Sequence, residues 1–167
     1  ISIVKPGDHV LDVGAGTGIL SLFAARAGAE RVYAVDSSEI LDAAERLVVE
    51  NGYADVIGCI DGRAESIELP EQVDVLVSEW MGLFALTEAM FASVIAAADR
   101  HLKPGGRMIP GRIALFFTPV QGDKHYENHG PGFWKEDLYG FDFSSMVNYE
   151  IANFDSVTIE GNDCIPL

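Results

Sequence analysis

Apolar residues follow two different spacings in the first 110 residues of the chain. Short, continuous apolar runs are typical of buried strands, and they recur between segments with the three- and four-residue spacing of amphipathic helices. The predicted strands are His9–Val13, Arg31–Val35, Asp55–Ile60, Val73–Ser78 and Arg107–Ile109. The predicted helices are Gly18–Ala27, Glu39–Glu50 and Glu88–His101, with Ser37 or Ser38 capping the second and Thr87 the third. This alternation predicts an α/β fold with a doubly wound parallel sheet.

The pattern changes after Pro110. Arg112–Val120 is a long run of β-forming residues, residues 122–149 are aromatic and irregular, and Val157–Ile159 predicts a further strand. We therefore expect one domain over residues 1–110 and the beginning of a C-terminal β region over residues 111–167. Ile1 is not a methionine and the last residues form an unfinished β segment, so we expect the chain to be part of a longer protein.

Composition narrows the class of protein. With 167 residues, 49% of them hydrophobic, the chain can build one domain with a substantial core. It has no apolar run of membrane-spanning length and no secretory signal pattern, so we expect no membrane partner. Cys59 and Cys164 are far apart and outside any metal-binding pattern, so we expect no metal site and a reducing, cytoplasmic location, extended to the nucleus if the source is eukaryotic.

The formal net charge of −15 argues against direct nucleic-acid binding, which needs a basic surface. A strongly acidic protein attracts basic ligands or basic protein substrates over long distances. Simple solubility is the alternative explanation of the same charge.

A glycine loop lies between the first predicted strand and the first predicted helix. Its glycines, Gly14, Gly16 and Gly18, let a ligand approach the backbone, and the following helix start favours an anionic group. The spacing is GxGxG, whereas dinucleotide-binding proteins have GxGxxG. A tight strand–helix turn without any ligand, or an NAD site, would also explain glycines here.

Two carboxylates make the prediction more specific. Asp12 precedes the loop, where it could hold a ligand ammonium, and Asp36 ends the second strand, where it could accept ribose hydroxyls. S-adenosylmethionine (SAM) carries an ammonium, a carboxylate and a ribose in that order. The stretch Val10–Gly18 resembles the first motif, (V/L)LDxGxGxG, of class I SAM-dependent methyltransferases, which have a Rossmann-like fold. In that family the segment after the third strand, here Asp61–Glu65, contacts adenine.

Ser78-Glu79-Trp80-Met81-Gly82 follows the fourth predicted strand, and Glu88 comes nine residues after Glu79. Two carboxylates that converge on one pocket suit a guanidinium, which is permanently charged and has a planar set of donors. Glu88 could instead simply stabilise a helix start, and Trp80 and Met81 could be core residues.

The stretch from Ser78 to Glu88 resembles the double-E loop of the protein arginine methyltransferases. The resemblance continues through Leu102–Gly106, Met108–Pro110 and Phe133-Trp134 to Tyr139–Asp142. It implies a protein arginine N-methyltransferase that converts SAM to S-adenosylhomocysteine, with a basic, arginine-containing protein or peptide as substrate and a homodimeric parent protein. The implied site residues are Glu79 and Glu88 for the guanidinium, Asp12, Gly14 and Gly16 for the methionine moiety, Asp36 for the ribose, Ala64 and Glu65 for the adenine, and Trp80, Met81 and Met90 for the acceptor pocket.

The chain departs from the family pattern at several points. Asp36 stands where the family usually has Glu, and the family's N-terminal helices, threonine–histidine–tryptophan loop and most of its β-barrel are absent from these residues. His101, His125 and His129 do not match the family's catalytic histidine. The alternatives are a methyltransferase acting on a small-molecule or other nitrogen or oxygen acceptor, and a SAM-binding module without turnover.

Overall fold

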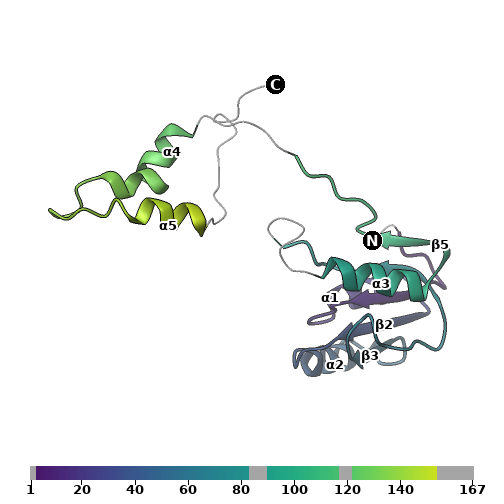
Figure 1. Ribbon diagram of the computed structural model, residues 1–167. Coiled ribbons are helices and arrows are strands. Elements are labelled where there is room, and N and C mark those ends of the chain that lie inside the picture. The colour runs from purple at the N-terminus through teal and green to yellow at the C-terminus, as the bar shows by residue number, and fades with distance from the viewer. Residues whose placement is uncertain (1–2, 83–89, 117–121, 154–167) are drawn as a thin grey trace. The chain divides into compact units, whose positions relative to one another are not determined.

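The computed structural model describes residues 3–82, 90–116 and 122–153, apart from the side chains of residues 124 and 125. The chain divides into two compact units, Ile1–Ile113 and Ala114–Leu167 (Figure 1). Each unit is described by itself below. No helix in the described ranges is long and apolar enough to cross a bilayer.

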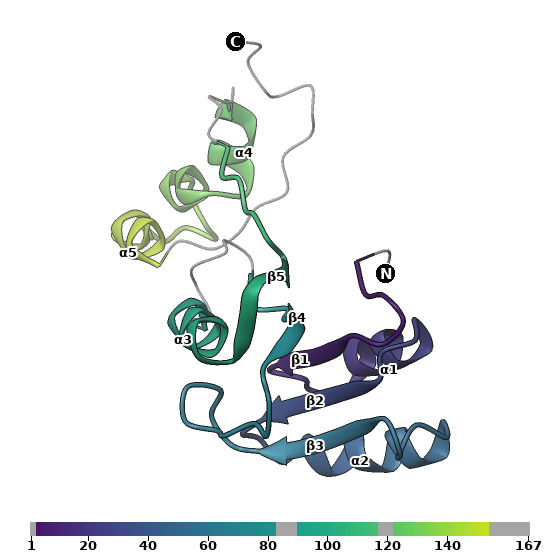
Figure 2. The same ribbon diagram turned by 90° about the vertical axis from the view of Figure 1, so that its right-hand side faces the viewer.

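Unit 1 is built on a five-stranded parallel sheet in the order β3-β2-β1-β4-β5. Its strands are β1 (His9–Val13), β2 (Arg31–Asp36), β3 (Ile57–Asp61), β4 (Val73–Val77) and β5 (Leu102–Ile109). The chain moves outward from β1 in one direction to β3, then returns to β4 and β5 on the other side (Figure 2). The order therefore reverses beside β1, and in such sheets ligands bind at the carboxyl ends of the strands near this reversal.

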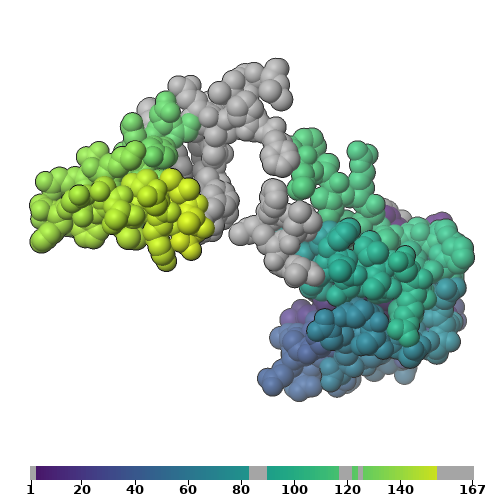
Figure 3. Space-filling view, in the orientation of Figure 1, coloured from purple at the N-terminus to yellow at the C-terminus, as the bar shows by residue number. Residues whose placement is uncertain are grey.

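In the described part of unit 1, three helices cover the two faces of the sheet: α1 (Ile19–Arg26), α2 (Leu41–Glu50) and α3 (Phe91–His101). Figure 2 shows α1 and α2 on one side and α3 on the other; α3 is turned toward the viewer in the space-filling view of Figure 3. Because side chains alternate along β1, Val10 packs in the core on the α1 face, while Leu11 and Val13 pack in the core on the α3 face. The predicted doubly wound α/β fold is confirmed.

Several helix and strand boundaries differ from those predicted from the sequence. The hydroxyl of Ser38 donates to the Asp36 carboxylate at 2.6 Å, and α2 begins only at Leu41 without a side-chain cap, so the predicted serine cap is wrong. Helix α3 ends at His101 as predicted but begins at Phe91; Thr87, the predicted cap, lies outside the described residues. Strand β5 begins at Leu102, five residues early, because a register irregularity opposite β4 accommodates the Pro-Gly-Gly segment.

Unit 2 contains short helices where the sequence predicted irregular structure: α4 (Asp123–Asn128), the 3-10 helix η1 (Pro131–Lys135) and α5 (Met146–Ala152). Trp134 of η1 packs against other aromatic rings and is hydrogen-bonded to α5. The ring of Trp134 lies 5.3 Å from that of Phe133 and 6.3 Å from that of Phe143, and its indole N–H donates to the Glu150 carboxylate. Such contacts leave no helical period in the sequence, which explains why the prediction missed these elements.

The predicted β run Arg112–Val120 is wrong for its described part. Residues 112–116 pair with no strand among the described residues, and Phe116 is 89% exposed. A strand needs a partner for its backbone groups, so β-forming residues alone do not make one. Residues 117–120 and the predicted strand Val157–Ile159 lie outside the described ranges.

Candidate functional site

The carboxyl ends of β1, β2 and β3 are joined by backbone hydrogen bonds. The N–H groups of Gly14 and Ala15 both donate to the carbonyl of Val35 at 2.9 Å, and the N–H of Gly62 donates to the carbonyl of Asp36 at 3.0 Å. The loop after β1 therefore bends over the end of β2, and the loop after β3 is held beside it. These bonds fix the frame in which the predicted cofactor residues lie.

The position of Gly14 requires a residue without a side chain, for two reasons. Its φ of +70° is in the left-handed region that L side chains rarely adopt. A Cβ at this position would also come within 2.7 Å of the Met90 methyl carbon, so Met90 closely approaches the glycine loop. Gly16 has a φ of +55°, but nothing lies within 4 Å of where its Cβ would be.

Asp36 connects the glycine loop to the end of β2. Its Oδ2 accepts a hydrogen bond of 2.9 Å from the N–H of Gly16, and its Oδ1 accepts from the N–H and hydroxyl of Ser38. Burial alone would raise the pKa of this carboxyl, but these donated hydrogen bonds outweigh it and hold the pKa below its usual value. A carboxylate offers about four lone-pair positions, so the ionised Asp36 can still accept from a ligand.

Asp12 lies beneath the loop, not at its surface. The alternation along β1 turns its side chain toward α1, where Oδ2 accepts a 2.7 Å hydrogen bond from the hydroxyl of Ser21. The side chain is fully buried, and Oδ1 has no partner among the described residues. Burial raises the pKa of Asp12 to about 6, against the opposing effect of the Ser21 hydrogen bonds. Contact with a ligand ammonium stays a prediction for this residue.

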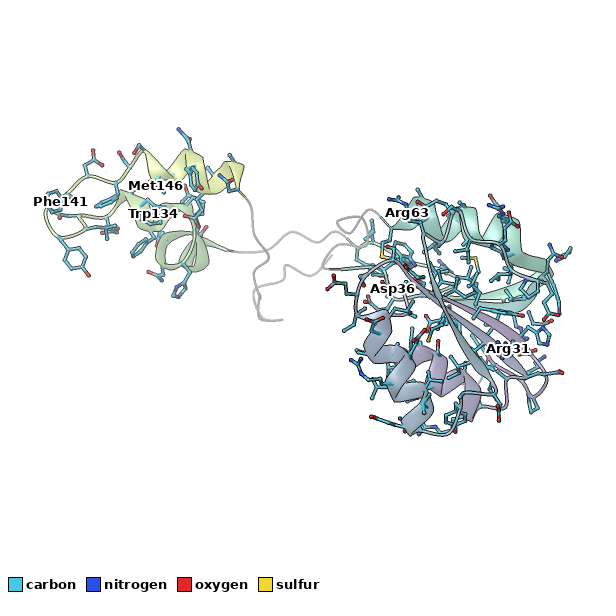
Figure 4. The ribbon with its side chains drawn as sticks, turned by 90° about the horizontal axis from the view of Figure 1, so that it is seen from below. Arg31, Asp36, Arg63, Trp134, Phe141 and Met146 are labelled. Atoms are coloured by element: carbon cyan, nitrogen blue, oxygen red, sulfur yellow. The ribbon has the colours of Figure 1, made fainter. Side chains whose placement is uncertain are left out.

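A pocket of about 380 Å³ opens at the ends of β1, β2 and β3. Five of the predicted site residues line it: Gly14, Asp36, Ala64, Glu65 and Met90. Gly62 and Arg63, which also line it, lie in the predicted adenine segment Asp61–Glu65 without an individual role. The sequence reasoning did not assign the other lining residues, which are Val13, Val35, Ser37 and Ser93. Figure 4 shows Asp36 and Arg63 at the same end of unit 1, with Arg31, at the start of β2, toward the other end.

Arg63 and Glu65 form an ion pair at the rim of this pocket. Nε and Nη2 of Arg63 lie 2.6 and 2.5 Å from the same oxygen, Oε1 of Glu65. The backbone N–H of Glu65 and then the Arg63 side chain donate to this carboxylate and lower its pKa. Ser93 could have been found from its helical spacing, since it stands three residues after Met90 and therefore on the same face of the chain where α3 begins.

The end of β4 positions the first predicted catalytic carboxylate. Ser78 is buried; its hydroxyl donates to the Val13 carbonyl at 2.6 Å and its N–H donates to the Ile109 carbonyl at 2.9 Å. Glu79 follows directly and is exposed, with Oε1 accepting a 3.3 Å hydrogen bond from the N–H of Met81. Because Ser78 is tied to β1 and β5, Glu79 leaves the sheet at a fixed point next to β1.

Trp80 and Met81 do not line the pocket. Trp80 is 6% exposed and packs against Phe91, with ring centroids 5.3 Å apart, while Met81 packs against the same core on the α3 face. The Trp80 indole N–H is buried and has no acceptor among the described residues. Glu88, the second predicted catalytic carboxylate, lies outside the described residues. The described ranges contain no cluster of His, Cys, Asp and Glu that could hold a metal ion.

Comparisons with known proteins agree with this architecture. Residues 10–106 match a family model described as a methyltransferase domain. A probable protein arginine N-methyltransferase 6 from Arabidopsis thaliana is 48% identical over 141 residues, which cover 84% of this chain and 32% of that protein. Protein arginine N-methyltransferase 1 from Schizosaccharomyces pombe is 44% identical over 164 residues, which cover 95% of this chain and 48% of that protein.

Solved structures give the same result. The Trypanosoma brucei PRMT1 enzyme–prozyme heterotetrameric complex with AdoHcy matches with a TM-score of 0.75 and 38% identity, over 88% of this chain and 46% of that one. Arabidopsis thaliana protein arginine methyltransferase 10 matches with a TM-score of 0.70 and 40% identity, over 89% and 46% of the two chains. The chain thus spans between about a third and a half of the length of these relatives. The family model covers more than half of the chain, which therefore belongs to the methyltransferase-domain family.

Proposed function

We propose that this chain binds SAM in the pocket at the ends of β1, β2 and β3, and that the protein transfers the methyl group to an arginine side chain of a basic protein or peptide. The observation that carries the proposal is the juxtaposition of two features at the reversal point of the sheet. The glycine loop follows β1 and is hydrogen-bonded to Asp36, the last residue of β2. The exposed Glu79 follows β4, which pairs with β1 on its other side.

The residues of the pocket fit the chemical parts of SAM. The Asp36 carboxylate would accept from the ribose hydroxyls, Ala64 and Glu65 would contact the adenine, and the backbone of Gly14 and Gly16 would approach the methionine end. Asp12 has a buried carboxylate oxygen without a described partner, which suits a positively charged ammonium group. When bound, SAM supplies an electrophilic methyl group on a sulfonium.

The task of the protein is then to position a nitrogen nucleophile. Glu79 and Glu88 would hold the guanidinium by charge-assisted hydrogen bonds and draw its positive charge toward the bonded nitrogens, so that the remaining nitrogen is the more nucleophilic. Orientation by two carboxylates also removes the entropy cost of aligning the acceptor during the reaction. Met90, which approaches Gly14, would separate the cofactor pocket from the acceptor.

Similarity to arginine methyltransferases supports this acceptor, and the net charge of −15 supports a basic substrate. One similar structure is a heterotetrameric complex, and we propose that the full protein also assembles, as a homodimer. The proposal includes residues 1–110 as the SAM-binding domain, residues 111–167 as the beginning of a substrate-binding β region, and a cytoplasmic location.

Methyl transfer to a peptide tests the proposal. The full-length protein is incubated with methyl-labelled SAM and an arginine/glycine-rich peptide, with the same peptide carrying lysine in place of arginine as the matched control. Label in methylarginine on the first peptide alone supports the proposal. SAM binding with transfer to small amines or hydroxyl compounds, or with no transfer, would support one of the two alternatives and contradict arginine methylation.

A further inference from the structure

Arg63 belongs to no part of the proposed chemistry, yet it occupies the rim of the pocket beside Glu65. Both of its contacting nitrogens, Nε and Nη2, are directed at Oε1 of Glu65, at 2.6 and 2.5 Å. Neither contact uses Oε2. The pair therefore fixes the orientation of the carboxylate while one oxygen stays outside the contact with the guanidinium.

The backbone around the pair is also fixed. Residues after β3 form a tight turn in which the carbonyl of Arg63 accepts hydrogen bonds from the N–H groups of Ser66 and Ile67, at 2.8 and 3.1 Å. Arg100 on α3 donates to the backbone carbonyl of Glu65 at 3.2 Å and pairs with Glu68. Glu65 is thus held by its backbone through α3. Its carboxylate accepts from Arg63, from its own backbone N–H and from the Ser93 hydroxyl, and it still has lone-pair positions for a ligand.

Stability does not account for the Arg63–Glu65 pair. The two side chains are 71% and 32% exposed, and an exposed ion pair contributes little to the free energy of folding. The effect of the pair is local. It restricts the Glu65 carboxylate to one orientation at the rim of the pocket. It also places a positive charge at a rim that carries two anionic side chains, Asp36 and Glu65.

We propose that Arg63 is a positioning residue that holds Oε1 of Glu65 and leaves Oε2 to accept a hydrogen bond from the exocyclic amine of an adenine base. This inference rests on the proposed SAM site and deepens it. An amine at that position of the purine donates to a carboxylate oxygen, whereas a carbonyl at the same position would set two acceptors against each other. Arg63 would therefore contribute to the preference for adenine over hypoxanthine.

The test compares the affinities of S-adenosylhomocysteine and S-inosylhomocysteine by titration calorimetry with the full-length protein. The two compounds differ in that amine and carbonyl and in the proton that hypoxanthine carries on the adjacent ring nitrogen. Wild-type protein is expected to bind the adenosyl compound more tightly. Arg63→Ala should weaken adenosyl binding about tenfold, because the carboxylate loses its fixed orientation, and should lower the adenosyl-to-inosyl affinity ratio toward that of Glu65→Gln. Arg63→Lys, which keeps the charge but replaces the two planar nitrogens with a single ammonium, should fall between wild type and Arg63→Ala.

Arg46→Ala, which removes an exposed arginine on α2, is the matched control and should leave both affinities unchanged. Thermal unfolding of Arg63→Ala should also match the wild type, as expected for an exposed pair. An unchanged affinity ratio in Arg63→Ala would overturn this inference alone, even if both affinities fell together. Wild-type protein that binds neither compound would overturn the proposed function as well.

Discussion

The backbone N–H of Gly16 donates a 2.9 Å hydrogen bond to Oδ2 of Asp36, so the side chain that ends β2 also holds the loop that follows β1. The same carboxylate accepts from Ser38 through Oδ1. Asp36 therefore has two functions, which the sequence alone does not distinguish. It shapes the glycine loop, and it presents a negative charge at the pocket.

Replacing Asp36 tests both functions at once. Asp36→Asn keeps an acceptor for Gly16 but removes the charge, and hydrogen bonds to charged groups contribute about 1.5–3 kcal/mol. We expect SAM affinity to fall roughly ten- to a hundredfold in calorimetry. Asp36→Glu retains the charge and should lose much less. Asp99→Asn, at an exposed position on α3, is the control that should bind as the wild type does.

Gly14 and Gly16 allow a comparison between backbone strain and pocket filling. Both have positive φ, so each change to Ala should cost about 1 kcal/mol of folding free energy. Only a Cβ at Gly14 meets another residue, the Met90 methyl carbon at 2.7 Å, and the flexible Met90 side chain can relieve this contact by moving. We expect both changes to weaken SAM binding in calorimetry and to lower the thermal unfolding temperature. Gly14→Ala should weaken binding more, because its Cβ also displaces Met90 toward the pocket.

A double-mutant cycle identifies the contact as the cause. In a Met90→Ala background, Gly14→Ala should reduce SAM affinity less than it does in the wild type, because the displaced side chain is gone. Equal effects of Gly14→Ala in both backgrounds would mean that the backbone, and not the Gly14–Met90 contact, determines the loss.

Much of this site could be predicted because strand ends converge by topology. Asp36 ends a strand that pairs with β1, so its closeness to the glycine loop follows once the parallel order is known. The burial of individual side chains and their hydrogen-bond partners were harder to predict from the sequence. Asp12 was expected at the ligand surface, but the alternation along β1 turns it toward Ser21. Arg63 gave no signal by itself, because its contact with Glu65 depends on a turn held by backbone hydrogen bonds.

Glu79 is the residue that separates cofactor binding from methyl transfer. It is exposed after β4 and does not line the pocket, so Glu79→Gln should leave SAM affinity within about twofold of wild type. Loss of the negative charge should reduce methyl transfer to an arginine peptide by roughly 10²–10³-fold, as for other groups that stabilise charge in the transition state. Glu45→Gln on α2 is the matched control. A parallel fall in SAM affinity would contradict the assignment of Glu79 to the acceptor.

Asp12 should make the stability of the protein depend on pH. Its pKa in the folded protein is about 6, raised from 3.8 because the side chain is buried. Below about pH 3 the carboxyl is protonated in both the folded and unfolded states. As pH rises, the unfolded state ionises first, and by about pH 7 the folded state has lost about 3 kcal/mol of relative stability. Asp12→Asn should therefore be more stable than wild type above pH 6 in urea unfolding, with the difference vanishing below about pH 3.

Binding of SAM should reverse this effect if its ammonium reaches the unpaired Oδ1 of Asp12. A positive charge beside the carboxylate lowers its pKa, so the protein should release a proton on binding near pH 5.5, where free Asp12 is mostly protonated. Calorimetry in two buffers with different ionisation enthalpies measures the number of protons released. Asp12→Asn should release fewer protons than wild type at this pH. Equal proton release would show that the ammonium does not reach Asp12 and would leave that residue a purely structural role beneath the loop.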